Sequence, residues 1–253
     1  MKYYKTPDLI KDAYLLPWNE KDNPNGWIEP TTFCQLKCPG CYRGLDKKDY
    51  KHVHEDFLEL KKQIDNFVSI RNIQTLSIAG GEPLLYPKIE ELISYAHKKG
   101  LRTMIYTNGL ALNEEKLRSL KDSGASQFVL HIDKFQKRDG YQDENDLLEL
   151  RKKYCNLFRK VGGVSLGFIQ PMSKDNLKDM HLLLDFYEKN MDIVNLIVFT
   201  LYREVCWDHT IKPEINTNIN IVDVVSEIQS KHEYRPCSYL SNTKKTDNPT
   251  WLF

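Results

Sequence analysis

The stretch GWIEPTTFCQLKCPGC, residues 26–41, starts as a short apolar strand and ends in a loop that carries Cys34, Cys38 and Cys41. The three cysteines have C-x3-C-x2-C spacing, and three neighbouring thiols cannot all pair with one another as disulfides. Parallel α/β folds collect their active sites at the C-terminal ends of strands. We therefore expect this loop to follow the first strand of an α/β sheet and to hold a metal group.

Two kinds of metal group are compatible with the cysteine loop. A structural zinc ion takes four ligands, and the sequence has no second C-x2-C motif, so the fourth ligand would be His52, His54 or Cys237. Three soft thiolates also suit an iron-sulfur cluster in which one iron has no protein ligand. The spacing favours the cluster over zinc.

The remaining cysteines, Cys155, Cys206 and Cys237, stand far apart in the sequence. They form no further motif, so we expect a single cluster, with Cys155 as a buried thiol in a helix.

The rest of the chain alternates between short apolar runs and longer amphipathic segments. Strands are predicted near 26–33, 73–79, 101–107, 125–133, 162–171 and 192–203, and helices near 53–70, 88–100, 113–124, 145–160, 174–190 and 219–230. Six strand-helix units indicate right-handed crossovers and a parallel sheet. The sheet is either an open doubly wound sheet or a partial barrel.

Composition sets further limits. The 253 residues include 36 basic and 35 acidic side chains, for a net charge of +1, so no overall field attracts nucleic acid. No apolar run approaches the ~20 residues of a membrane span, and the N-terminus lacks the pattern of a signal peptide. We expect a cytoplasmic protein with a leader at 1–26, a catalytic core at 27–232 and an extension at 233–253. Either that extension packs onto the core or the natural chain continues beyond it.

A second motif, AGGEP at residues 79–83, follows the second predicted strand. Together with CQLKCPGC at 34–41, it makes the chain resemble the radical S-adenosylmethionine (radical SAM) enzymes, without indicating a subfamily. The resemblance implies a partial (β/α)6 barrel and a [4Fe-4S] cluster held by Cys34, Cys38 and Cys41. It also implies that S-adenosylmethionine binds the open iron and is cleaved reductively to a 5′-deoxyadenosyl radical, which abstracts hydrogen from a substrate.

The same resemblance implies contacts to the cofactor. Gly80, Gly81 and Glu82 match the stretch that contacts the methionine amino group. Thr107 and Asn108, at the end of the third strand, match positions with polar contacts to the cofactor, although Asn108 before Gly109 is equally typical of a simple turn.

The fourth strand ends in LHIDKFQ, residues 130–136. Alternation places His131 and Asp133 on one face of the strand, where the family binds the carboxylate or ribose of the cofactor. A histidine stands here in place of the serine found in many members. Gln136 is a candidate contact to cofactor or substrate.

Two features depart from the family pattern. Gly40 precedes the last cysteine where an aromatic residue is common, and the aromatic side chain is displaced to Tyr42, which we take as a candidate adenine contact. The fifth strand lacks the family's glycine-rich adenine motif. Gln170 and Phe168 in this strand are candidate neighbours of the cofactor or substrate.

Tyr202 and Arg203 follow the sixth strand and are further substrate candidates. The guanidinium of Arg203 suits a phosphate or carboxylate, or it pairs with Glu204 at the surface.

The functional expectation is a radical SAM enzyme, an oxidoreductase or transferase, that acts on a small molecule such as a metabolite, nucleoside, sugar or lipid. No side chain is assigned a catalytic role, because cluster and cofactor carry the chemistry. A reductant such as flavodoxin or ferredoxin is expected as a partner. The alternatives are the same chemistry on a peptide or protein, and a metal-binding protein without catalysis.

Overall fold

The computed structural model describes residues 25–39, 41–45, 51–202 and 215–232. The predictions for the leader, for Gly40, for Arg203 and for the extension at 233–253 lie outside the described residues. Cys206 and Cys237 lie outside them as well.

Six parallel strands form one sheet in the order β1-β2-β3-β4-β5-β6. Their bounds are β1 Asn25–Ile28, β2 Thr75–Ile78, β3 Arg102–Thr107, β4 Gln127–His131, β5 Ser165–Met172 and β6 Val194–Leu201. Each crossover leads to the adjacent strand in the same direction, whereas a doubly wound sheet reverses its strand order part-way. Among the described residues β1 and β6 do not pair, so the sheet stays open. The predicted partial (β/α)6 barrel is confirmed.

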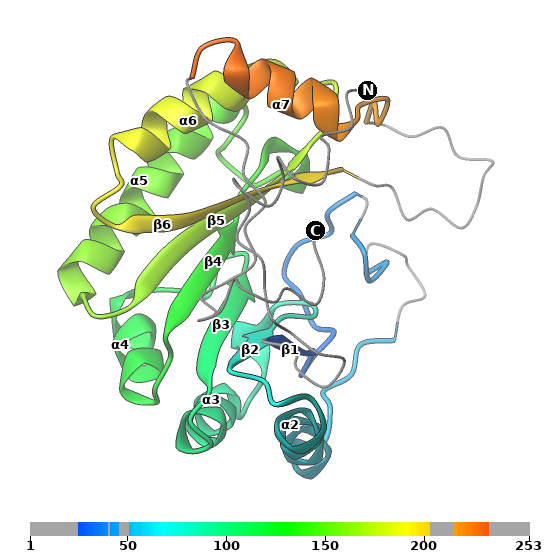
Figure 1. Cartoon of the computed structure of the whole chain (residues 1–253), viewed down its shortest axis with the longest axis vertical. Coiled ribbons are helices and arrows are strands. Elements are labelled where there is room, and N and C mark those ends of the chain that lie inside the picture. The colour runs from blue at the N-terminus through cyan, green and yellow to red at the C-terminus, as the bar shows by residue number, and fades with distance from the viewer. Residues whose placement is uncertain (1–24, 40, 46–50, 203–214, 233–253) are drawn as a thin grey trace, which may run out of the picture.

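Helices follow the strands in the predicted order. They are α2 Phe57–Arg71, α3 Ile89–Lys98, α4 Glu114–Asp122, α5 Glu144–Val161, α6 Met180–Glu188 and α7 Ile221–Gln229, with short 3₁₀ turns η1 Pro83–Leu85, η2 Lys134–Gln136 and η3 Leu177–Asp179. Asn113 caps α4 as predicted, because its side chain accepts a hydrogen bond from the N–H of Lys116 at 2.8 Å. Figure 1 shows the helices arranged around the convex side of the curved sheet, with the segment that carries the cysteine loop on the other side.

The main core fills the space between the sheet and these helices. Helix α3 illustrates why the sequence folds this way: Ile89, Leu92, Ile93 and Ala96 are its buried residues and follow one another at helical spacing. They form one apolar stripe that packs on the sheet. Cys155 belongs to this core and is fully buried in α5, as expected.

Alternation along the strands selects the side chains that face the other side of the sheet. Trp27, Tyr106, His131, Ile169 and Thr200 come from five strands and line one cavity. Their immediate neighbours Ile28, Ile105, Ile132 and Phe168 are buried. The concave side of the sheet is therefore where ligands can bind.

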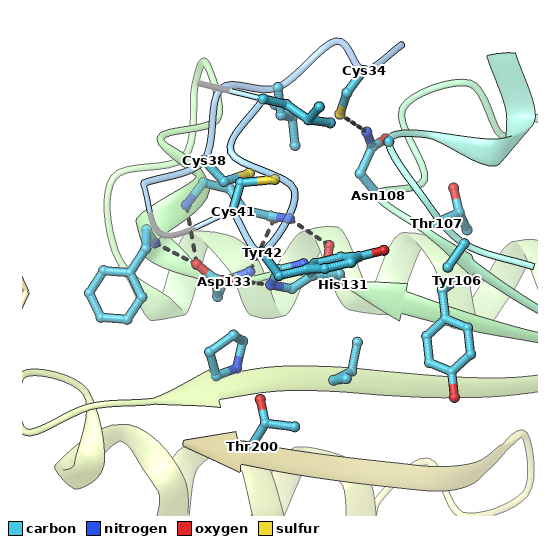
Figure 2. Close-up of a pocket in the computed structure, with 18 of the residues that line it drawn as sticks. Cys34, Cys38, Cys41, Tyr42, Tyr106, Thr107, Asn108, His131, Asp133 and Thr200 are labelled. Carbon is cyan, nitrogen blue, oxygen red and sulfur yellow. Dashed lines mark hydrogen bonds and ion pairs between the residues drawn. The ribbon is translucent and has the colours of Figure 1, made fainter. Parts of the chain in front are cut away.

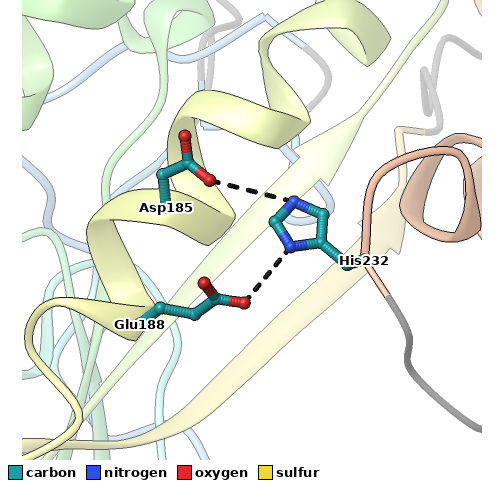
Figure 3. Close-up of side chains that lie close together, drawn as sticks. All are labelled: Asp185, Glu188 and His232. Carbon is teal, nitrogen blue, oxygen red and sulfur yellow. Dashed lines mark hydrogen bonds and ion pairs between the residues drawn. The ribbon is translucent and has the colours of Figure 1, made fainter.

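Helices α6 and α7 are joined by a histidine between two carboxylates (Figure 3). His232 Nδ1 lies 3.2 Å from Glu188 Oε1, and its Nε2 lies 3.9 Å from Asp185 Oδ1. A metal ion binds one ring nitrogen, whereas here each nitrogen faces a different carboxylate. We interpret the group as a polar contact between α6 and the residues that follow α7.

Among the described residues, no helix has the length and apolar character required to cross a membrane.

Candidate functional site

A cavity of about 510 Å³ lies at the C-terminal ends of the strands. All three loop cysteines line it, together with Gly80 and Gly81 after β2 and Thr107 and Asn108 at the end of β3. His131, Asp133, Gln136 and Tyr202 line the same cavity. The fold therefore brings most of the residues selected from the sequence to one site (Figure 2).

The three cysteines are free thiols in this structure. Sulfur ligands of one tetrahedral zinc ion, with bonds of about 2.3 Å, are about 3.8 Å apart. Among the described residues, the one group of three potential ligands whose atoms lie within 4.8 Å of one another is Asp185, Glu188 and His232, not the cysteines. The cysteine loop is thus open wider than a single-ion site requires.

The histidines considered as additional zinc ligands are used elsewhere. The Nδ1 atom of His52 lies 2.8 Å from the carbonyl oxygen of Thr32, and the ring of His54 stacks on Phe33 at 4.4 Å. Neither lines the cavity. Among the described residues, neither histidine proposed as the fourth zinc ligand is therefore positioned to bind an ion together with the three cysteines.

Burial makes the cysteine thiols difficult to ionise. Desolvation, with a contribution from the nearby Asp133 carboxylate, raises the pKa of Cys38 to about 12. Burial also raises the pKa of Cys34. Thiolates in this loop are therefore stable only beside positive charge, which a bound metal group provides.

The base of the cysteine loop is held by backbone hydrogen bonds on two sides. On one side, the N–H of Thr32 donates to Val53 and that of Glu55 donates to Pro30. On the other, the N–H of Gly81 donates to the carbonyl oxygen of Thr31 at 2.8 Å, and that of Glu82 to Phe33 at 2.7 Å. The segment that leads into Cys34 is thus fixed between residues 53–55 and 80–82.

Close backbone approach explains the two glycines of the GGE motif. A Cβ atom on Gly81 would overlap the carbonyl oxygen of Phe33 and lie 2.7 Å from the carbonyl carbon of Thr32. Gly80 has a φ of +110°, and its Cβ would lie 2.6 Å from the oxygen of Thr31. Both positions require glycine to keep the cysteine loop in place.

Glu82 lies behind this glycine pair and is completely buried. Its carboxylate accepts hydrogen bonds from Thr107 Oγ1 at 2.6 Å, from the N–H of Asn108 at 2.7 Å and from the N–H of Leu84 at 3.1 Å. Burial nevertheless raises its pKa to about 7. The carboxylate joins the ends of β2 and β3, and its contact with an ammonium group stays a prediction.

Asn108 forms the turn considered for it and also contacts the cysteine loop, while its contact with the cofactor stays a prediction. Its Oδ1 accepts from the N–H of Leu110 at 2.8 Å, which forms the turn. Its Nδ2 donates to Gln35 at 3.1 Å and to the sulfur of Cys34 at 3.7 Å. The amide therefore reaches the cysteine loop directly (Figure 2).

Tyr42 holds the end of the cysteine loop against Glu29 and Gly80 through its hydroxyl group. Its hydroxyl donates to Glu29 Oε1 at 2.8 Å and accepts from the N–H of Gly80 at 3.2 Å. Arg43 pairs with the same glutamate at 3.1 Å. The ring of Tyr42 lines the cavity and is 54% exposed, so an adenine contact is sterically open and stays a prediction.

His131 and Asp133 contact each other, with the histidine Nε2 facing the carboxylate of Asp133. Burial opposes ionisation of Asp133, but the charge and hydrogen bond of His131 and the N–H of Phe135 outweigh it and lower its pKa. The amide of Gln136 forms a capping box with Asp133. The amide of Gln136 is thus used in hydrogen bonds within the protein, whereas the imidazole of His131 is partly exposed and lines the cavity.

Two buried arginines support the strand ends, and no sequence pattern marks either of them. Arg138 donates to the carbonyl oxygens of Asn108 at 2.6 Å and His131 at 2.9 Å, and to Gln136 Oε1 at 2.8 Å. Arg151 pairs with Glu144 and donates to Gln170 at 2.9 Å. Arg138 joins β3 to β4 behind the cysteine loop.

The structure corrects the expectation for β5. Gln170 is 1% exposed and is bonded to Arg151, and Phe168 packs against Tyr187 on the helix side of the sheet. Ile169 and Pro171 face the cavity instead. Gln170 is not positioned to contact a substrate, because the strand alternation has the opposite phase from the one expected.

Several cavity residues were missed. Trp27 and Tyr106 place their rings 5.1 Å apart on the cavity wall, and Leu36, Phe135 and Thr200 complete it. Strand alternation from the candidate Thr107 would have placed Tyr106 on the other face, and Trp27 looked like an ordinary strand residue. The walls are mostly apolar as a result.

Comparison with known proteins agrees with this geometry. Residues 28–187 match the model of the Radical SAM superfamily. The chain belongs to the radical SAM superfamily. This match spans the cysteine loop, the GGE segment and the strands as far as α6.

Curated relatives of this radical SAM chain have different activities. It is 26% identical over 183 residues to Fe-coproporphyrin III synthase of Methanosarcina barkeri, covering 70% of this chain and 44% of that protein. It is 28% identical over 193 residues to 7,8-dihydro-6-hydroxymethylpterin dimethyltransferase of Methanocaldococcus jannaschii, covering 74% and 38%. The chain spans less than half the length of these relatives.

Among solved structures, SuiB of Streptococcus suis bound to S-adenosylmethionine has the same fold, with a TM-score of 0.63 and 18% identity over 89% of this chain and 52% of that one. Radical SAM enzymes use a [4Fe-4S] cluster and S-adenosylmethionine, and this superfamily assignment confirms the cofactors expected from the sequence.

The residues present fit such a cluster. Three thiols surround one cavity, and Arg138 Nη1 is buried without a hydrogen-bond partner among the described residues. The charge of Arg138 acts on Cys38. A cluster held by three thiolates would be anionic, and the positive charge of Arg138 near Cys38 would stabilise it.

Proposed function

We propose that this chain is a radical SAM enzyme that acts on a small molecule bound in the 510 Å³ cavity, with Cys34, Cys38 and Cys41 as the cluster ligands. The observation that supports the proposal is the convergence of three free thiols, the GGE segment and the polar strand ends on one cavity. A cytoplasmic location belongs to the same proposal.

When bound and reduced, the cluster supplies the electron that cleaves S-adenosylmethionine to methionine and a 5′-deoxyadenosyl radical. The protein supplies position and shielding. Asn108 orients Cys34 through its amide, and Arg138 places a buried positive charge beside Cys38.

The cofactor itself is expected to contact the exposed parts of the cavity. We assign His131 and Asp133 to its carboxylate or ribose, because an imidazole held by a carboxylate presents its remaining edge to the cavity. The peptide groups of Gly80 and Gly81 and the ring of Tyr42 are assigned to the methionine and adenine parts.

The remaining wall suits a substrate with an apolar or aromatic portion. Trp27, Tyr106, Ile169 and Leu201 line it, and the cavity volume is within the usual range for small ligands, about 300–1,000 Å³. Apolar walls exclude water from a reactive intermediate. Tyr202 stays a substrate candidate.

A peptide substrate is the second candidate. SuiB, which shares the fold, has also been solved bound to the precursor peptide SuiA. At 19% identity this likeness concerns the fold alone. A screen of apolar metabolites against unfolded peptides, read out as stimulated release of 5′-deoxyadenosine, distinguishes the two substrate classes.

The decisive test is anaerobic reconstitution with iron and sulfide, followed by reduction with dithionite in the presence of S-adenosylmethionine. We expect about four iron atoms per chain and release of 5′-deoxyadenosine. A four-iron protein that releases none would contradict the enzymatic proposal and favour a metal-binding protein without catalysis. One equivalent of zinc with no iron would contradict the cluster.

The ligand assignment is tested by Cys38→Ala, with Cys155→Ala as its matched control. Two thiolates cannot hold the cluster, so Cys38→Ala should lose both iron and cleavage. Cys155 is fully buried in α5, away from the cavity, and its replacement should leave iron content unchanged. Equal iron loss in the two variants would argue against the assigned role of Cys38.

A further inference from the structure

A second cavity, of about 980 Å³, shares a wall with the first. Gln35, Leu36 and Lys37, which lie between the ligands Cys34 and Cys38, line it on one side, and helix α5 lines it on the other. Leu36 and Gln136 line both cavities. This second cavity, which we call the basic groove, therefore borders the cluster site.

The charge of the basic groove differs from that of the whole chain. Five basic residues line it, against two acidic ones; they are Lys37, Lys137, Arg138, Lys153 and Lys160, with Glu114 and Asp139. Lys160 pairs with Glu114 at 2.5 Å, and Arg118 contacts the same carboxylate at 2.9 Å. Arg138 is 6% exposed, so the exposed positive charge of the groove comes from its lysines, in a chain whose net charge is only +1.

Apolar side chains lie between these charges. Leu110 is 50% exposed, and Leu36 and Leu157 are partly buried along the same cavity. Protein interfaces combine apolar and charged side chains in this way.

The proposed reaction requires such a partner. Each cleavage of S-adenosylmethionine consumes one electron, and electron tunnelling weakens steeply with distance. A carrier protein must therefore dock close to the loop that holds the cluster. Protein carriers of low potential are acidic around the exposed edge of their cofactor, which is complementary to a surface that combines basic and apolar side chains.

We propose that the basic groove docks an acidic one-electron carrier protein of the flavodoxin class, an inference that rests on the proposed function. The carrier loses one electron, the bound cluster gains it, and no proton or chemical group is transferred across this surface. Lys137 and Lys153 contribute steering charge, and Leu110 contributes the apolar contact.

The test compares Lys153→Glu with Lys152→Glu in the reconstituted protein. The two lysines are neighbours on α5, both are exposed, and only Lys153 lines the groove. Both substitutions change the net charge by the same amount. A difference in rate between the two variants therefore depends on the position of the charge and not on its size.

The measured quantity is the rate of 5′-deoxyadenosine release at low ionic strength, driven either by reduced flavodoxin or by dithionite. With limiting flavodoxin, Lys153→Glu should lower the rate on the order of tenfold, whereas Lys152→Glu should change it less than about twofold. Added salt should reduce the difference in rate between the two variants, because it screens the charges. With dithionite both variants should match the parent, because a small reductant needs no docking surface.

Equal effects of the two variants with flavodoxin, or an equal loss with dithionite, would overturn the docking proposal. If the parent cleaves no cofactor with dithionite, the proposed function fails instead. In that case calorimetric binding of oxidised flavodoxin decides the docking question separately: binding weakened by Lys153→Glu alone supports it. Absence of binding, or preference for a polyanion such as RNA, refutes it.

Discussion

Replacing Gly81 by alanine should dislodge the cysteine loop. The new Cβ would overlap the carbonyl oxygen of Phe33 and lie 2.7 Å and 2.8 Å from the carbonyl carbon and oxygen of Thr32. All of these are backbone atoms, so no side chain can rotate away. The two strands of chain must separate by roughly an ångström to restore ordinary contact distances.

That separation breaks the hydrogen bonds from Gly81 to Thr31 and from Glu82 to Phe33, now 2.8 Å and 2.7 Å long. Each contributes about 0.5–1.5 kcal/mol, and overpacking adds about 1–3 kcal/mol. We therefore expect the free energy of unfolding to fall by about 2–6 kcal/mol, measured by anaerobic urea titration. Iron content after reconstitution should fall with it.

Gly26→Ala is the matched control, because neither Gly26 nor Gly81 has a positive φ. Its Cβ would meet only Ile73 Cδ1 at 2.9 Å and the ring of Phe67 at 3.2 Å, both of which belong to side chains that can move. The expected change is within about 1 kcal/mol. A Gly81→Ala protein with unchanged stability and full iron content would refute the close backbone contact between Gly81 and residues 32–33.

Two further predictions concern buried polar groups. The pKa of Glu82 is raised to about 7 in the folded protein, so the native state binds the extra proton and stability should fall as pH rises from about 5 to 7, by about 3 kcal/mol in all. Glu82→Gln should flatten this dependence in urea titrations across that range, and a parent without such a slope would contradict the raised pKa. Arg138→Met should lower the free energy of unfolding by about 2–4 kcal/mol, because the carbonyl oxygens of Asn108 and His131 lose their donor. Arg138→Lys should not restore the loss, since one ammonium group cannot reproduce the planar fork, and full recovery with lysine would show that charge alone is needed.

The fold was predictable because apolar periodicity and turn residues mark its elements. Gly100 and Gly124, both at positive φ, end helices where the sequence indicated. Periodicity alone left open the choice between a doubly wound sheet and a barrel, because strand order depends on contacts between segments far apart in the sequence. The resemblance carried by the cysteine loop and the AGGEP motif predicted the barrel.

The site was predictable where a motif follows a strand, as for Cys34, Gly81 and Asp133. It was not predictable where burial decides the role. Arg138 looks like any surface arginine in the sequence, yet it is 6% exposed and spans two strand ends. Gln170 illustrates the opposite error, because a shift of strand alternation by one residue moves a side chain to the other face.

The double attachment of the cysteine loop also sets an order of events during synthesis. Every backbone group that holds residues 30–33 belongs to residues 53–55 or 80–82, and the amide that reaches Cys34 belongs to Asn108. The backbone contacts of the cysteine loop are therefore completed by the first three strands, while the supporting Arg138 is translated later. We expect a nascent chain of this protein to acquire the shape of its cysteine loop before its second half has left the ribosome, with Arg138 then consolidating an existing arrangement.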